Sequence, residues 1–147
     1  MTKIEELESL YGDLLGAPAP STDLDERMHR LLFPDFQKRS NHAPGYTASV
    51  DACILAIRGR MPGWSYRVME CSVSDDAWVI PDFNDPTHGE RLRNALPAAA
   101  MGDPVEHLGT DIDRRPSGQP ALALCMAIVA AHIAVAEEPE IEGAPAI

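Results

Sequence analysis

A long uncharged run near the C-terminal end of the chain constrains its fold more than any other feature. Within SGQPALALCMAIVAAHIAVAEEPE, residues 117–140, the sixteen residues from Ala121 to Ala136 carry no charged side chain. As a helix they would extend about 24 Å, whereas a bilayer core is about 30 Å thick. The flank that follows is acidic, which is the wrong charge for a cytoplasmic anchor. The run therefore predicts a buried helix of a soluble protein and no membrane span.

Two apolar stripes in this run indicate how the helix is surrounded. The first comprises Leu122, Met126, Val129 and Ile133, and the second Leu124, Ile128, Ala131 and Val135. A helix with two apolar faces needs neighbours on two sides, so we expect it at the centre of the fold. Its alanines would also permit close approach of a second copy, so a homodimer is an alternative explanation for the second stripe.

Apolar residues at helical spacing predict three further helices. The first covers residues 2–15 and begins with a capping box, Thr2 and Glu5. A second begins at Ser21 and stops before Pro34. The third lies in YTASVDACILAIRGRM, where apolar positions recur from Val50 to Met61 before a Pro-Gly pair ends the pattern.

Alternating residues predict an antiparallel hairpin after this helix. WSYRVMECS and AWVIPDF are its two strands, separated by a polar turn. Trp64 and Trp78 are expected to anchor the hairpin in the core. Pro81, close to the end of the second strand, indicates an edge strand or a bulge.

These elements predict an α+β fold: a small antiparallel β-sheet sandwiched by helices, with the C-terminal apolar helix central. The 147 residues form a single domain, with an N-terminal helical region over 1–45 and an α-β-β-α sandwich over 46–136. An insertion at 84–116 interrupts the sandwich. We expect a short helix over 88–96 and a third strand within 105–112, and an acidic flexible tail over 137–147.

Three motifs in this order resemble a phage-associated family, the phage ABA sandwich domain. They are YTASVDACILAI, the GW strand with its aromatic partner, and QPALALC, which together span Tyr46–Ile80 and Pro120–Ala134. In that family, a YTxSxDAA helix, a GW strand and a TPALALCxAAL helix recur. The resemblance implies a phage origin and helices packed on a small sheet, and it assigns no catalytic residue. The insertion at 84–116 and the residues before 45 depart from the pattern.

Net charge and cysteine content limit which classes of partner and which cellular compartment we expect. The net charge is −11, from 12 basic and 23 acidic residues, which excludes a phosphate-binding footprint for nucleic-acid polymers. It permits mimicry of nucleic acid toward a basic partner, with solubility as the alternative. Cys53, Cys71 and Cys125 stand alone, without a zinc-type CxxC pair. With no apolar segment in the first fifteen residues, we expect a reduced, cytoplasmic protein without a signal peptide.

The insertion carries the candidate ligand residues. Arg91 and Arg93, together with Arg114 and Arg115, are positioned in sequence to clamp a phosphate or carboxylate, and the alternative is surface arginines balancing nearby acids.

The same insertion contains the one metal-like cluster, His107, Asp111 and Asp113, which would share a face of a strand. The alternative is the polar face of an edge strand. We predict no resident cofactor, and we include His107 among the ligand-binding candidates.

Neither a catalytic motif nor a catalytic residue is predicted. His132 and Cys125 lie on the apolar helix and are interpreted as core residues, like Cys53. The sequence therefore favours a non-enzymatic phage accessory protein that counters host defence by blocking a host protein. Alternatives are a sponge for a small anionic ligand such as a nucleotide second messenger, a small metal-dependent hydrolase, and a virion or assembly component.

Overall fold

The computed structural model describes residues 1–35, 43–70, 72–104, 113–116 and 118–137, with residues 113–116 described by their backbone. The expected acidic tail lies outside these residues, apart from Glu137. The elements, in chain order, are α1 (Lys3–Gly16), α2 (Thr22–Leu32), α3 (Val50–Arg60), β1 (Trp64–Glu70), β2 (Ser74–Pro81), α4 (Gly89–Ala95), α5 (Pro97–Met101), β3 (Asp113–Pro116) and α7 (Pro120–Glu137).

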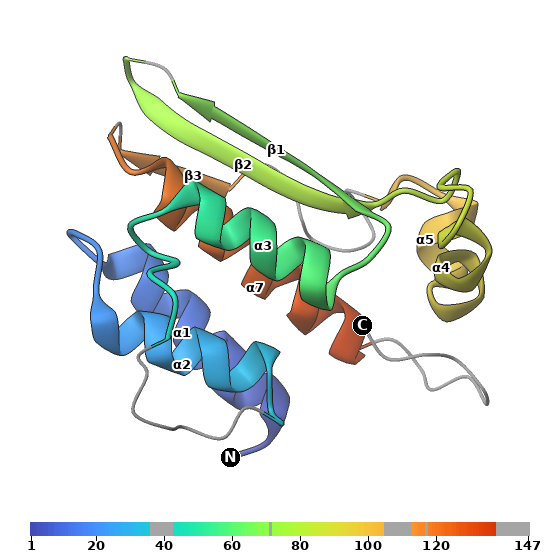
Figure 1. Ribbon diagram of the computed structural model, residues 1–147, viewed down its shortest axis with the longest axis horizontal. Helices are drawn as coiled ribbons and strands as arrows, with labels where there is room; N and C mark the ends of the chain where they lie inside the picture. Colours follow the sequence, from blue (N-terminus) through green and yellow to red (C-terminus); the bar gives the residue numbers. More distant parts are fainter. Residues whose placement is uncertain (36–42, 71, 105–112, 117, 138–147) are drawn as a thin grey trace.

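The elements are stacked in layers, with α7 in the middle (Figure 1). The three strands form one antiparallel sheet in the order β1-β2-β3. Helix α7 packs against β2 on one side and against α1 on the other, while α3 lies beside it and α2 packs on α1. The predicted α+β class, the antiparallel sheet and the central position of the last helix are confirmed.

Most of helix α7 is enclosed by the rest of the chain. Every side chain from Ala121 to Val129 is buried, as are Ala131 and His132. By length and composition this helix could cross a membrane, but 61% of it is buried inside the fold. It is therefore packed as a core helix of this fold, and α1 occupies a face for which a second copy was the alternative.

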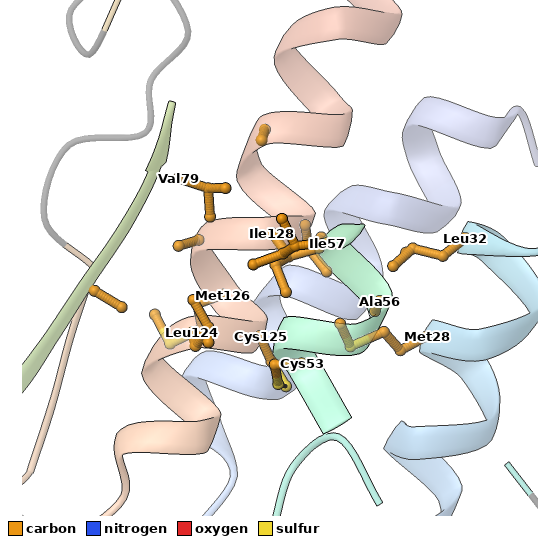
Figure 2. Packing of buried hydrophobic residues seen from close by; sticks show 14 of the residues in the cluster. Met28, Leu32, Cys53, Ala56, Ile57, Val79, Leu124, Cys125, Met126 and Ile128 are labelled. Atoms are coloured by element: carbon orange, nitrogen blue, oxygen red, sulfur yellow. Dashed lines mark hydrogen bonds between the residues drawn. The ribbon is translucent and has the colours of Figure 1, made fainter. Parts of the chain in front are cut away.

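The core is assembled from apolar side chains of several elements (Figure 2). Leu124 and Met126 of α7 lie on the side of Val79 in β2, and Ile128 meets Ile57 of α3. All five side chains are buried. Burial of such side chains contributes about 1.5–3 kcal/mol each, so the α7 layer supplies much of the stability of the fold.

Capping explains where the predicted helices begin. The Thr2 hydroxyl accepts the Glu5 amide at 3.2 Å, and the Glu5 carboxylate accepts the Thr2 amide at 3.2 Å, which completes the predicted capping box. At α2 and α3, the Ser21 and Ser49 hydroxyls accept the amides of Leu24 and Ala52, respectively, and so cap these helices. These caps confirm the starts predicted for the first three helices.

Strand β2 anchors the sheet on the core, and it corrects the prediction for Trp78. Its alternate residues Asp75, Ala77, Val79 and Pro81 are buried. Trp78 lies between them and therefore points to the opposite face, where the Arg67 guanidinium lies 5.8 Å from its ring centroid. Trp64 is buried as predicted, but Trp78 is not a core anchor because the inward positions belong to smaller neighbours.

The position of Pro81 also differs from the prediction. Strand β2 is the central strand of the sheet, and its pairing with β1 runs in register from Trp64↔Pro81 to Glu70↔Asp75. Strand β3 pairs only with residues 74–77, so Pro81 lies beyond the end of that ladder, where a missing amide costs no strand pairing. The third strand exists, but it covers Asp113–Pro116; the predicted 105–112 lies outside the described residues.

A buried carboxylate fixes the start of α7 against the sheet. Asp75 has no exposed surface, and its Oδ2 accepts a hydrogen bond from the Gln119 amide. The carbonyl of Gln119 in turn accepts the amide of Ala123, so the carboxylate sits at the N-terminal end of the helix. A carboxylate is favourable at that end of a helix, although the other oxygen of Asp75, Oδ1, has no hydrogen-bond partner among the described residues.

Candidate functional site

A groove lies between α1 and α2, within the described part of the chain. The helices turn their leucines toward the core and leave polar side chains facing outward between them. The groove has a volume of about 340 Å³ and is lined by Met1, Glu6, Ser9, Arg27, Arg30 and Leu31. This volume is within the range of small-molecule sites.

Arg27 joins the two walls of the groove. Its Nη1 donates to Asp13 Oδ2 at 2.5 Å, and its Nη2 lies 3.4 Å from the Ser9 hydroxyl. The Arg27 side chain is 31% exposed and that of Asp13 56%, so solvent screens the ion pair and its net contribution to stability is small. Its main effect is to hold one guanidinium in position at the groove.

Arg30 lies one helical turn further along α2 and is exposed. No hydrogen bond or ion pair joins it to another residue in the described part of the chain, which leaves its five N–H donors to solvent or a ligand. The neighbouring Leu31 and Met1 add apolar wall. The groove thus combines the Arg30 guanidinium, unpaired among the described residues, with the positioned guanidinium of Arg27 and the Ser9 hydroxyl, beside the carboxylate of Glu6. These donors suit a phosphate or carboxylate on a partly apolar molecule.

The arginines predicted from sequence occupy other surroundings. Arg91 donates from Nη2 to the carbonyl of Pro62 at 3.2 Å, and Arg93 donates from Nη1 to the carbonyl of Phe83 at 2.6 Å. Both therefore satisfy backbone acceptors around α4. Each guanidinium has further N–H donors, but one of its nitrogens is already used by a backbone carbonyl and would have to give up that bond to bind a ligand.

The other predicted pair lies at the opposite end of the sheet. Arg114 and Arg115 are in β3, where their backbones pair with Asp76 and Asp75. Arg91 binds beside the start of β1, which pairs with the end of β2. Five strand residues at about 3.3 Å each separate the backbone positions of the two pairs.

The predicted metal cluster is only partly within the described residues. His107 and Asp111 lie outside them, and Asp113 is placed in β3, with its backbone opposite Ala77. Within the described parts of the chain, no group of three or more His, Cys, Asp or Glu side chains is arranged to hold a metal ion.

A buried polar cluster joins α2 to the segment that precedes α3. Asp25 Oδ1 accepts the Thr47 amide and the Thr47 hydroxyl, each at 2.7 Å. Beside it, His29 Nδ1 lies 2.5 Å from the Tyr46 hydroxyl. Burial lowers the pKa of His29 and raises that of Tyr46. These buried groups are hydrogen-bonded to one another, so we assign them a structural role that holds α2 to the segment before α3.

His132 is buried on α7, as predicted. Burial, and then the charges of Lys3 and Arg60, lower the pKa of His132 to about 3. Its Nε2 and the Nε of Arg60 have no hydrogen-bond partner among the described residues. With so low a pKa, the imidazole of His132 holds a proton too weakly to act as an efficient general base near pH 7.

Sequence reasoning did not find the groove. Arg27 and Arg30 have the i, i+3 spacing of neighbours on one helix face, and Ser9 and Asp13 have the i, i+4 spacing, but nothing local shows that the two faces meet. In comparisons with known proteins, no family model, curated protein or solved structure matches the chain.

Proposed function

We propose that this chain is a phage accessory protein that acts by binding, and that the α1–α2 groove holds an anionic group of its ligand. The observation that carries the proposal is Arg30, an exposed guanidinium without an intramolecular partner among the described residues, at a groove of about 340 Å³. Small anionic metabolites, including nucleotides, fit this chemistry. A few local arginines suffice for such a ligand even though the chain carries a net charge of −11.

The phage origin rests on the three sequence motifs. In support, the helix 50–60, the hairpin and the helix 120–137 that carry the motifs pack together as helices on a small sheet. The proposed place of action is the host cytoplasm, which is consistent with a buried α7 and with two buried free thiols, Cys53 and Cys125.

Ligand titration tests the groove. Nucleotides, cyclic dinucleotides and simple carboxylates are added to the protein, and binding is measured by calorimetry and by the rise in melting temperature with ligand concentration. Arg30→Gln should weaken binding of any positive compound about 10-fold or more, since a hydrogen-bonded charge is worth about 1.5–3 kcal/mol. Arg58→Gln, an exposed arginine on α3, is the matched control. A panel that gives no shift contradicts the proposal.

A second candidate, the blocking of a host defence protein, is favoured by the acidic surface of α1. Glu5, Glu6 and Glu8 are all exposed on this helix, with Glu6 at the groove, and the helix contains one basic residue, Lys3. Such a face suits a partner with a basic surface.

The host-protein candidate has its own experiment. A partner captured from infected-cell lysate should bind the purified protein more weakly as salt rises, because exposed charges are screened. Changing the three glutamates to glutamine should remove most of that salt dependence. Salt-independent binding, or full binding by the triple variant, would contradict this mode.

A further inference from the structure

The contact between α3 and α7 places two cysteines against each other in the core. Cys53 Sγ lies 3.5 Å from Cys125 Sγ, although the residues are 72 positions apart in sequence, and neither side chain has exposed surface. Figure 2 shows the two side chains meeting between the neighbouring helices. We propose that this pair is a redox site, at which a peroxide or a small-molecule disulfide oxidises the two thiols to a disulfide that locks α3 onto α7.

The geometry requires little movement. The sulfur–sulfur distance in a disulfide is about 2.05 Å, so the two atoms must approach by about 1.5 Å. The Cys53 thiol lies 3.2 Å from the carbonyl oxygen of Tyr46, to which it donates a weak hydrogen bond. Forming the disulfide gives up that bond and leaves a backbone acceptor behind, a small loss compared with a covalent link between two helices.

With a peroxide, the reaction proceeds in two balanced steps. One cysteine sulfur, as its thiolate, attacks a peroxide oxygen; the O–O bond breaks, and a sulfenic acid forms as water leaves. The second sulfur then attacks the sulfenic sulfur, the S–O bond breaks, and a second water leaves. Two thiols and one hydrogen peroxide thus give one disulfide and two waters. The two electrons lost by the sulfurs reduce the peroxide.

Burial controls when this reaction occurs. Desolvation raises the pKa of the Cys125 thiol well above its ordinary value, with Cys53 adding to the effect, so little thiolate is present in the closed core. An oxidant also has no direct access to either sulfur. Oxidation therefore requires α3 to separate from α7, and its rate reports that opening. This behaviour differs from that of an exposed redox-sensor cysteine, which reacts without any opening.

The test compares reduced and oxidised full-length protein in a Cys71→Ser background, so that Cys53 and Cys125 are the only thiols. Reduced protein is treated with hydrogen peroxide or oxidised glutathione, with and without sub-denaturing urea. The intact mass should fall by about 2 Da, and peptide mapping should recover residues 53 and 125 cross-linked. The melting temperature should rise by about 10 °C and return after reduction, because the link closes a long loop in the unfolded state.

Urea and two single variants separate this site from a merely structural pair. Oxidation should accelerate as urea rises below the unfolding midpoint. Cys53→Ala and Cys125→Ala should each lose both the cross-link and the gain in melting temperature. Recovery of glutathione adducts or sulfinic acids without a 53–125 cross-link would overturn the proposal, as would a melting temperature that falls on cross-linking. If a variant fails to fold, the comparison of oxidised with reduced protein of the same sequence still shows whether the 53–125 cross-link forms and raises the melting temperature. The inference is independent of the α1–α2 groove.

Discussion

The two ends of α3 differ in whether the buried polar groups near them have hydrogen-bond partners. At its N-terminal end, the segment before the helix is tied to α2: Asp25 accepts two hydrogen bonds from Thr47, and His29 contacts the Tyr46 hydroxyl. At its C-terminal end, Arg60 and the nearby His132 of α7 each keep a buried nitrogen without a partner among the described residues. The buried polar side chains at the first end satisfy one another, whereas those at the second end leave two nitrogens unsatisfied.

This difference shows how one helix is fixed. A buried polar pair that satisfies itself specifies a unique position, while an unsatisfied one lowers the free energy of unfolding by about 1–3 kcal/mol. We therefore expect the N-terminal end of α3 to depend on side-chain chemistry, and the C-terminal end to depend on pH and on steric fit. Four measurements test whether the two ends of α3 differ in this way.

The largest effect concerns His132 in acid. Its pKa of about 3 in the folded protein lies below the unfolded value of 6.5, so the unfolded chain binds more protons between those values. Stability is therefore unaffected by this group above pH 6.5 and falls as pH drops, by about 4 kcal/mol at pH 3.5. Urea unfolding of His132→Leu should lack this part of the acid slope. An identical slope in the variant would show that other groups cause it.

The next effect is at the N-terminal end. Asp25→Ala leaves the buried Thr47 amide without its acceptor, while the Thr47 hydroxyl keeps only the Ser21 carbonyl as acceptor. Because two hydrogen bonds to a charged group are lost, the free energy of unfolding should fall by about 3 kcal/mol. The matched control is Asp23→Ala, an exposed acid in the first turn of the same helix. Equal losses in the two variants, measured by urea titration, would contradict the structural role assigned to Asp25.

Steric fit is tested at Gly63, just after α3. Its φ is +88°, and a Cβ there would lie 2.6 Å from His88 Cβ and 2.9 Å from Leu92 Cδ1. Gly63→Ala should cost about 2–3 kcal/mol through backbone strain and the clash with α4. Gly118 has a similar φ of +92° but open space around it, so Gly118→Ala should cost only the strain, about 1 kcal/mol. Similar losses would mean that packing at Gly63 contributes little.

The smallest effect is expected from Tyr46→Phe. Removal of the hydroxyl deletes the contact with His29 Nδ1 and should lower the free energy of unfolding by about 1 kcal/mol. Tyr66→Phe on β1 is the comparison, because Tyr66 is only partly buried in the sheet. If both substitutions are neutral, the His29–Tyr46 contact does not hold the N-terminal end of α3.

Much of the architecture could be predicted because its signals are local. Capping residues and apolar spacing located α1, α2, α3 and α7, and alternation located the hairpin. What failed depends on partners far away in sequence. Trp78 was expected in the core because tryptophan is large and apolar, yet the strand's alternation gave the inward positions to Ala77 and Val79. Helix α5 is five residues long and has little periodicity to detect.

The candidate site was less predictable than the fold. Arginines near one another in sequence were expected to act together, but Arg91 and Arg93 found backbone carbonyls around α4. Whether an arginine is free depends on which unpaired acceptors the fold brings near it, and that is a tertiary property. Arg30 is exposed in the groove because α2 packs on α1 with its leucines inward.

Strand β2 has a consequence for how this chain can change over evolutionary time. The polypeptide leaves β2 at Pro81 and comes back at Asp113, which pairs with Ala77 of the same strand. The chain between Pro81 and Asp113 begins and ends at strand β2, so its two ends are held close together like those of a closed loop. Loop-closure entropy rises only logarithmically, and doubling such a segment costs about 0.6 kcal/mol. Changes in length are therefore tolerated best outside α4 and α5, whose Leu92, Leu96 and Ala99 are buried in the core.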